Sequence, residues 1–263
     1  MIEDQPNPKT YDVVIVGAGG AGMMCAAKAG QRGLSVLLLD HSEKIGRKIL
    51  ISGGGRCNFT NIHTKPENFH SSNQHFCKSA LSRYTPKDFI TLVQQHRIQY
   101  HEKKLGQLFC DHSAEEIVEM LVHECKKAHV RFTLGCSISD IGKEAEQFVL
   151  KTNRGEFRCK SLVIATGGLS IPKIGATGFG YQIAKQFGLK VEETFPALVG
   201  FDLKQEDMKK LHELIGVAFD SVVTCRKHKS RENTLVTHTG LSGPAILQAS
   251  LYWHPGDALV IDV

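Results

Sequence analysis

The fold is decided by YDVVIVGAGGAG, Tyr11–Gly22, in which an unbroken apolar run stops at a cluster of glycines. Its first half, Tyr11–Val16, is rich in β-branched residues, which is typical of a strand buried on both faces of a parallel sheet. The Ala- and Met-rich segment 20–32 predicts a helix that stops at Gly33, and 35–39 predicts a second buried strand. Together these segments predict a βαβ unit.

The glycines of this stretch have the spacing of a dinucleotide-binding turn. Gly17 permits the tight turn, Gly19 lets a pyrophosphate approach the backbone, and Gly22 permits close helix packing, with Gly20 and Ala21 between them. Asp40 follows the second predicted strand, 18 residues beyond Gly22, where a carboxylate can accept hydrogen bonds from ribose hydroxyls. A carboxylate there would repel a 2′-phosphate, which disfavours NADP at this site. The alternative is a purely structural glycine turn.

A second turn motif, Ala165-Thr166-Gly167-Gly168, follows an apolar strand predicted over 161–165. The residues before it, 130–160, alternate as short strands and predict a β-meander with turns at Gly142-Lys143 and at 153–155. Flavoproteins that bind two dinucleotides place an Ala-Thr-Gly turn against their FAD. The alternative is a strand end that needs glycine for a positive φ.

Residues 41–72 form a polar, Gly-rich stretch with little periodicity, which predicts a functional loop or disorder. Within it, three glycines and three cations predict an anion-cradling loop. The alternative for the loop is a flexible basic surface segment. Cys57, which follows Arg56, could be a thiol of depressed pKa. The residues of this loop that we expect to bind cofactor are Arg47, Lys48, Ser52, Gly53, Gly54, Gly55, Arg56, Cys57 and Asn58.

These motifs resemble the signature of the BaiN/YhiN-like flavoproteins, a family of FAD-dependent NAD(P)H oxidoreductases also labelled aminoacetone oxidase-like. The likeness continues in the glycine-rich turn and helix 175–184, in Pro196–Val199, and in LVTHTGLSGPA, Leu235–Ala245. Phe179 stands where the family usually has Asp, which leaves any role of that carboxylate in doubt. The resemblance runs from about residue 11 to the end of the chain.

The resemblance implies FAD as cofactor, NAD(P)H as a transient electron donor, and a small organic substrate with an unsaturated bond or a carbonyl group. Flavin chemistry needs positive charge or N–H groups beside the ring, and we assign that role to the loop 53–58 with Arg56 or Lys48. Arg56 and His238 are the candidate catalytic residues, and His238 could pair with Ser242 or only position substrate. A NAD-binding dehydrogenase, a flavin-binding RNA-associated protein and an inactive truncated fragment remain as alternatives.

The expected fold class is α/β, with an FAD-binding Rossmann-type domain over 1–193 that combines a parallel sheet and a β-meander. Residues 194–263 are expected to form part of a β-rich inserted domain. In the family the chain then returns to complete the FAD domain, so we expect a C-terminal truncation. Weakened or absent FAD follows from that expectation unless another chain supplies the remainder.

Composition narrows the functional classes. The chain carries 32 Lys and Arg against 27 Asp and Glu, a mild net charge of +5, and its basic clusters are short, so nucleic acid is not the expected partner. No apolar run is long enough to span a membrane, and the acidic, Pro-containing start is unlike a secretory signal, which favours the cytoplasm. The eight dispersed cysteines are expected to be reduced thiols, and no metal site is expected.

Overall fold

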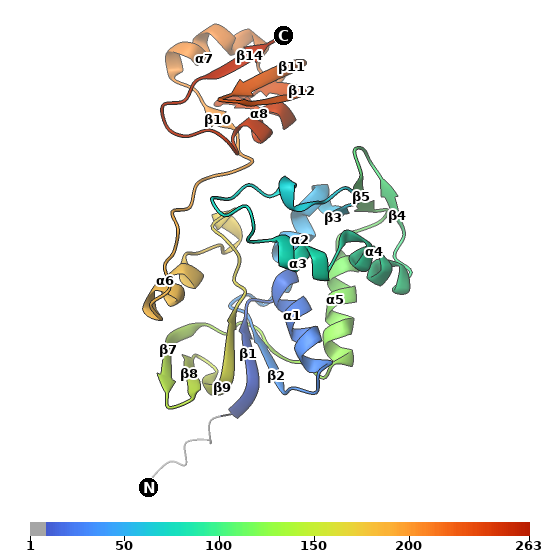
Figure 1. The fold of residues 1–263 in the computed structure, drawn as a ribbon, viewed down its shortest axis with the longest axis vertical. Helices are drawn as coiled ribbons and strands as arrows, with labels where there is room; N and C mark the ends of the chain where they lie inside the picture. The colour runs from blue at the N-terminus through green and yellow to red at the C-terminus, as the bar shows by residue number, and fades with distance from the viewer. Residues whose placement is uncertain (1–8) are drawn as a thin grey trace. The chain divides into compact units, whose positions relative to one another are not determined.

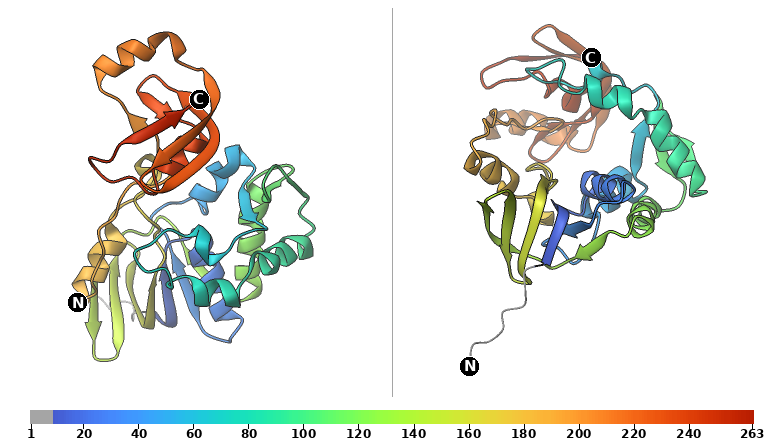
Figure 2. Two further views of the ribbon diagram at one scale, coloured as in Figure 1. Left: turned by 45° about the horizontal axis from the view of Figure 1, so that its top comes forward. Right: turned by 60° about the horizontal axis from the view of Figure 1, so that its bottom comes forward.

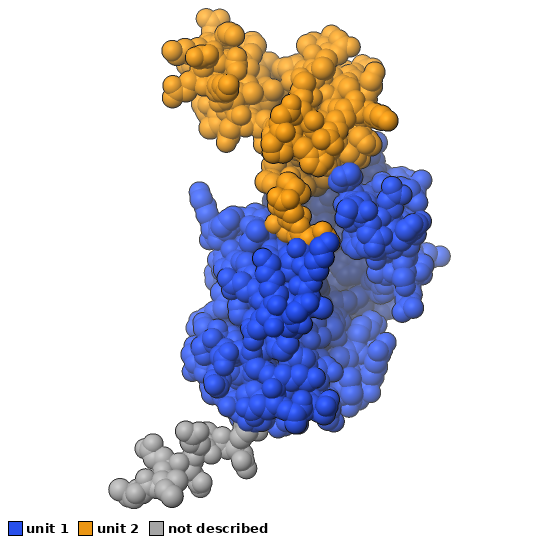
Figure 3. All heavy atoms as spheres, turned by 60° about the vertical axis from the view of Figure 1, so that its left-hand side comes forward, with its two compact units in different colours: residues 1–191 blue, residues 192–263 orange. Residues whose placement is uncertain are grey.

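A computed structural model describes residues 9–263 and divides the chain into two compact units, Met1–Val191 and Glu192–Val263 (Figure 3). The acidic, Pro-containing start considered above lies almost wholly outside the described residues. Each unit has a sheet and a hydrophobic core of its own. The two units are therefore described separately.

The first unit is built on a six-stranded sheet with the order β6-β2-β1-β9-β8-β7 (Figure 1). β1 pairs in parallel with β2 on one side and with β9 on the other, and β9, β8 and β7 form an antiparallel meander. This Rossmann-type α/β architecture agrees with the predicted fold class. The bounds of the strands are β1 Lys9–Val16, β2 Val36–Leu39, β6 Arg131–Thr133, β7 Ile138–Glu144, β8 Gln147–Thr152 and β9 Gly155–Ile164.

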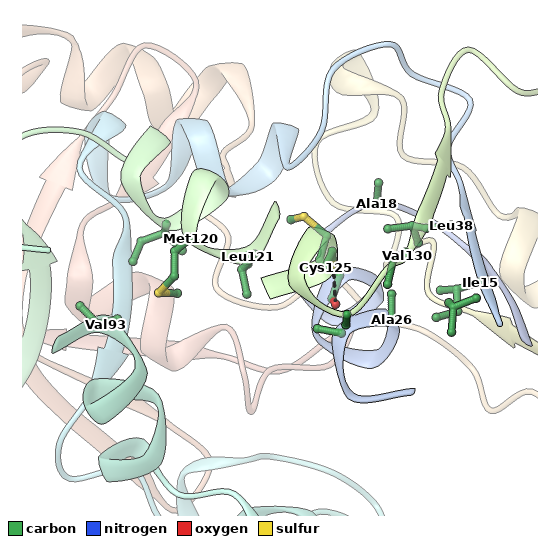
Figure 4. Close-up of a cluster of buried hydrophobic side chains, with 14 of the residues drawn as sticks. Ile15, Ala18, Ala26, Leu38, Val93, Met120, Leu121, Cys125 and Val130 are labelled. Carbon is green, nitrogen blue, oxygen red and sulfur yellow. Dashed lines mark hydrogen bonds between the residues drawn. The ribbon is translucent and has the colours of Figure 1, made fainter. Parts of the chain in front are cut away.

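Both faces of the central strand are buried, which explains its unbroken apolar sequence. Val13 and Ile15 face one core, which α1 (Gly20–Gly30) and α5 (Glu115–Lys127) cover. Figure 4 shows this core, where the Cys125 thiol donates to the Met23 carbonyl at 3.2 Å. The opposite face carries a second core, to which α6 (Phe179–Gln186) contributes Ile183. Successive side chains of a strand point to opposite faces, so one apolar run serves both cores.

Two details of the meander differ from the sequence-based expectation. The turn predicted at Gly142-Lys143 is wrong, because β7 continues through these residues and turns at Ala145, which has a φ of 49°. The separate strand predicted over 161–165 is also wrong in extent. β9 is a single strand that pairs with β8 along its first half and with β1 along most of its length.

The stretch after β2 is more ordered than its composition suggested. It folds as short elements that lead to a three-stranded sheet, β3-β5-β4 (Figure 2). The hydroxyl of Thr85 caps α4 by accepting from the amide of Asp88, and the Asp88 carboxylate accepts from the amide of Thr85. The elements here are α2 Arg47–Ile51, η1 Ser52–Gly55, β3 Asn58–Asn61, η2 Pro66–Asn68, α3 Lys78–Arg83, α4 Pro86–Gln95, β4 Tyr100–Glu102 and β5 Gln107–Cys110. After β9, η3 covers Pro172–Ile174.

The second unit is a five-stranded antiparallel sheet with the order β10-β13-β12-β11-β14. Its core places Val223 and Cys225 against Ile246 of helix α8. α8 begins at Pro244, directly after Gly243, as the sequence predicts. The bounds are β10 Phe201–Asp202, α7 Gln205–Leu211, η4 His212–Leu214, β11 Ala218–Cys225, β12 His228–Val236, β13 Gly240–Ser242, α8 Pro244–Ala249 and β14 Leu259–Asp262.

Candidate functional site

A cavity of about 380 Å³ lies at the carboxyl ends of β1, β2 and β9 in the first unit. Ligands of open α/β sheets bind at this edge, where strand order reverses. Many of the residues chosen from sequence line it, namely Gly17, Gly19, Gly20, Ala21, Asp40, Arg47, Lys48, Ala165, Thr166 and Gly167. The structure therefore brings the glycine turn, the carboxylate, two cations and the Ala-Thr-Gly turn together.

The turn between β1 and α1 needs glycine because the backbone is crowded there. Gly17 has a φ of 112°, and a Cβ at this residue would collide with the carbonyl of Ala165. A Cβ on Gly22 would collide with the carbonyl of Gly17. The missing side chain at Gly17 lets the Ala165 turn lie directly against the glycine turn, although β1 and β9 are far apart in sequence.

The N-terminus of α1 lies at the cavity, and neither its N-cap nor its first turn contributes an anion. Its N-cap, Gly19, offers no side-chain acceptor, and the first turn contains no acidic residue. The space where a Cβ of Gly19 would lie is empty within 4 Å. Backbone N–H groups and the positive end of the helix dipole therefore remain available to an anionic ligand. This arrangement fits the pyrophosphate of a dinucleotide.

Asp40 has a second role that the sequence did not reveal. Its Oδ2 accepts from the amide of Ala18 at 2.7 Å, and its Oδ1 accepts from the amide of Ser42 at 2.8 Å. The carboxylate is 15% exposed and lines the cavity, so it retains lone pairs for a ribose hydroxyl. Asp40 thus fixes the glycine turn while it faces the ligand space.

Lys48 joins two parts of the cavity wall. Its ammonium group donates to the carbonyl of Gly168 at 3.1 Å and to the hydroxyl of Ser170 at 3.2 Å. Gly168 does not itself line the cavity, but this bond fixes the turn that does. Arg47 lies near Gly175, where a Cβ would come within 3.3 Å of its guanidinium. Lys48 therefore positions the loop after β9, and Arg47 lies beside that loop.

Sequence reasoning missed several residues that line the cavity. His41 lies against Gly175, and Phe179, noted above only as a departure from the family pattern, also lines the cavity. The sequence signal for His41 is that it directly follows Asp40 at the end of β2. The other lining residues not chosen from sequence include Ser42, Lys44, Gly46, Ile49, Ser137, Ile138, Ile174 and Thr177.

The loop from Ser52 to Asn58 is not part of the cavity lining. Its three glycines have φ values of 58°, 68° and 85°, a run of left-handed residues that only glycine adopts readily. The carbonyls of Gly55 and Arg56 accept from the amides of Ala114 and Cys110. Arg56 itself is exposed. The structure therefore brings Arg47 and Lys48 to the cavity and leaves Arg56 outside its lining.

The thiol of Cys57 is not activated. Its side chain is buried, and burial raises its pKa above the ordinary value, against a weaker opposite effect of its hydrogen bond with Ser52. The alternative of a depressed-pKa thiol is therefore wrong. All eight cysteines are unpaired.

His238 belongs to the second unit, on the exposed turn between β12 and β13. The hydroxyl that organises this turn is that of Thr237, which donates to the Gly240 carbonyl at 3.0 Å and accepts from the Gly240 amide at 3.1 Å. Residues 9–263 contain no hydrogen bond between His238 and Ser242. The geometry thus offers no support for that catalytic pair.

Over residues 9–263, no group of three or more His, Cys, Asp or Glu side chains is arranged to hold a metal ion. None of the helices described combines the length and the apolar character that crossing a membrane requires.

Comparison with known proteins gives a family match and several relatives. The family model described as HI0933-like protein Rossmann domain matches residues 11–248. Ribosomal RNA dihydrouridine synthase from Escherichia coli is 54% identical over 254 residues, 96% of this chain and 64% of that protein. The protein of the same name from Haemophilus influenzae is 49% identical over 95% of this chain and 63% of its own length.

A more distant relative has a different name. The 3-dehydro-bile acid delta(4,6)-reductase of Clostridium scindens is 27% identical over 90% of this chain and 59% of its own length. The chain thus spans less than two thirds of each of these three relatives.

Proposed function

This chain belongs to the family of HI0933-like proteins with a Rossmann domain, and from that membership we propose that it is part of an FAD-dependent reductase. The observation that carries the proposal is the uncapped, acid-free N-terminus of α1 in one cavity with Asp40 and the Ala165–Gly167 turn. Such a site suits the adenosine and pyrophosphate of FAD. The proposed electron donor is NAD(P)H.

Each wall of the cavity has a distinct task in this proposal. The amides at the start of α1 bind the pyrophosphate, Asp40 accepts from ribose, and Lys48 holds the Gly168 turn beside the cofactor. Ile49 and Phe179 contribute apolar surface that excludes water. When bound, FAD supplies a ring that takes a hydride from NAD(P)H and delivers it to an electron-poor double bond.

For the substrate, we propose a uracil base of ribosomal RNA. The support is the name shared by the relatives at 54% and 49% identity. Saturation of the uracil C5=C6 bond adds a hydride to one carbon and a proton to the other, with both electrons coming from NAD(P)H. A cytoplasmic site of action, expected above, suits such a substrate. The proposal departs from the expected small organic substrate and from the expectation against nucleic acid.

A small unsaturated ketone is the second candidate, favoured by the relative named as a bile acid reductase. The two candidates share one chemistry, because in each a carbon–carbon double bond is conjugated to a carbonyl group. The arrangement of the cavity is compatible with either, since this proposal assigns its lining residues to the cofactor.

The test begins with the purified full-length protein. We expect flavin absorbance that bleaches on addition of NADH or NADPH. A protein with no flavin absorbance would favour a NAD-binding dehydrogenase and contradict the proposal. The reduced protein is then given ribosomal RNA that lacks dihydrouridine, or an unsaturated steroid ketone, and products are measured by mass spectrometry. Dihydrouridine supports the first candidate, and a saturated ketone alone supports the second.

A further inference from the structure

Positive charge is concentrated in one segment of the first unit. Residues 41–110 contain 11 Lys and Arg but only 4 Asp and Glu. The remaining 193 residues contain 21 Lys and Arg and 23 Asp and Glu. The net charge of +5 therefore arises entirely from this segment. Three of its cations, Arg47, Lys48 and Arg56, belong to the loops treated above. The others are Lys44, Lys65, Lys78, Arg83, Lys87, Arg97, Lys103 and Lys104.

Some cations elsewhere in the first unit pair with carboxylates, whereas several cations of this segment do not. Arg158 pairs with Glu144 and Glu156, and Lys160 pairs with Asp12. By contrast, six exposed cations form no salt bridge with any carboxylate of residues 9–263: Lys65, Lys78, Arg83, Lys87, Arg97 and Lys103. Their charge remains available to an anionic partner.

Part of this charge lies at the tip of the β4–β5 hairpin (Figure 1), where Lys103 and Lys104 precede the exposed Leu105. The tip is tied to the end of β3, because the Ile62 amide donates to the Gly106 carbonyl and the Asn61 amide side chain donates to the Leu105 carbonyl, both at 2.9 Å. Leu105 is 68% exposed and Ile62 is 44% exposed. We define the hairpin surface as Ile62, His63, Lys65, Lys103, Lys104 and Leu105.

Exposed aromatic rings lie in the loop that continues from the hairpin surface. The Pro66 carbonyl accepts from the Phe69 amide at 3.1 Å and from the Cys77 thiol at 3.9 Å, so Phe69 and Phe76 belong to one closed loop with Lys65. Phe69 is 42% exposed and Phe76 is 59% exposed. Aromatic rings that stand in water beside cations are typical of surfaces on which unpaired bases stack.

We propose that the hairpin surface, with Phe69 and Phe76, binds RNA that contains unpaired bases. The lysines contact phosphates and the two phenylalanines stack on bases. The proposal rests on the proposed ribosomal RNA substrate and adds where the chain holds that RNA, on the same unit as the cavity. The excess of positive charge favours RNA over a protein partner, because exposed apolar side chains alone would suit either.

The first experiment measures affinity of the full-length, flavin-containing protein for protein-free ribosomal RNA and for a fluorescein-labelled single-stranded 30-mer RNA. The triple variant K65Q/K103Q/K104Q is compared with K126Q/K127Q/K143Q. The control set removes the same charge from exposed sites of the same unit, and it also contains a lysine over a phenylalanine ring, since Lys143 lies over Phe148 as Lys103 lies over Phe109.

We expect the hairpin triple to weaken binding at least tenfold and to lower the salt slope of log Kd by about 2, at about 0.7 for each phosphate that a lysine no longer neutralises. The control triple should change neither quantity appreciably. An equal weakening in both triples would mean diffuse attraction and would overturn the proposal, as would no weakening in either. Unchanged flavin content and melting temperature verify that the variants are folded.

A second pair of variants separates stacking from charge. F69S/F76S should weaken binding about tenfold while the salt slope stays at the wild-type value, because no cation is removed. Phe195, 54% exposed in the second unit, provides the control F195S. If F69S/F76S binds like the wild type, the stacking part of the proposal is wrong.

Lysine acetylation tests whether the surface is free in the full-length protein. Lys65 and Lys103 should be acetylated rapidly without RNA and protected once ribosomal RNA is added. Protection without RNA would mean that protein covers the surface, which overturns the proposal. Dihydrouridine in ribosomal RNA is measured in parallel. A wild-type protein that binds RNA through these residues but forms no dihydrouridine would refute the proposed function and leave the RNA surface standing.

Discussion

Two glycine-rich loops of the first unit use glycine for different physical reasons. In the loop between β1 and α1, neighbouring backbone leaves no room for a Cβ, at Gly17 because of Ala165 and at Gly22 because of Gly17. In the loop 52–55, a Cβ at Gly54 or Gly55 would meet no atom within 4 Å, but both residues have left-handed φ. Crowding therefore acts at Gly17 and Gly22, and backbone conformation alone acts at Gly54 and Gly55. Gly53 combines both constraints, because it has a left-handed φ and its Cβ would also collide with the Asn58 amide.

The two loops also differ in what they present to a ligand. The first lines the cavity with amides at the end of a helix, whereas the second gives its carbonyls to the amides of Ala114 and Cys110. Three glycines in a row therefore indicate a backbone conformation, and only the surroundings tell whether that conformation serves binding. Four measurements test this difference between the two loops.

The largest effect is expected for G22A. Its Cβ would collide with the Gly17 carbonyl, and overpacking of this kind costs about 3 kcal/mol when the obstacle is backbone. We expect the free energy of unfolding in urea to fall by that amount and flavin to be lost together with it. A variant as stable as the wild type would mean that crowding does not govern the first loop.

A smaller and more selective effect is expected for G19A. Gly19 has an extended backbone that alanine adopts, and no atom lies within 4 Å of its Cβ position, so stability should change by no more than about 0.5 kcal/mol. The new methyl group would stand where the pyrophosphate approaches. We expect flavin affinity, measured by fluorescence titration, to fall at least tenfold. Equal affinity would place the phosphates elsewhere.

In the second loop, G54A should cost about 1 kcal/mol because of its left-handed φ of 68°. Asparagine tolerates this conformation better than alanine, so G54N should recover part of that stability. Flavin affinity should be unchanged in both variants. A fall in affinity in G54A would instead support the hypothesis, drawn from the sequence, that this loop contacts the flavin together with Arg56.

The smallest effect is expected for the reactivity of Cys57, which follows the same loop and is buried. Since burial raises its pKa, the thiol stays protonated at neutral pH and the thiolate fraction grows as pH rises towards and beyond 9.0. Alkylation by iodoacetamide, followed by peptide mass spectrometry, should therefore be slow at pH 7 and accelerate throughout the alkaline range. A rate that levels off near neutral pH would indicate a depressed pKa.

Much of the first unit was predictable because its signals are local. The run Tyr11–Val16, the glycine turn and the strand before Asp40 each carry their own pattern of apolar, glycine or acidic residues. Gly243 and Pro244 indicate the start of helix α8 in the same way. Within such segments, neighbours along the chain determine the conformation.

The features that escaped prediction depend on partners distant in sequence. β9 continues past the residue where the meander was expected to end, because β1 supplies hydrogen bonds along its second edge. β3 forms in a polar stretch because β5 pairs with it, nearly 50 residues later. His41 lies in the cavity lining against the loop that contains Gly175. No local pattern encodes these contacts.

Residue type and spacing are enough to specify the βαβ unit, the helix that can bind an anion and the acid at the strand end. Tertiary structure alone decided that the Ala165 turn closes over Gly17, that Lys48 bridges to Gly168, and that the 52–58 loop stays outside the cavity lining. The physical reason is parallel pairing of β1 with β9, which joins residues about 150 positions apart and is stabilised by burial of both faces of the sheet.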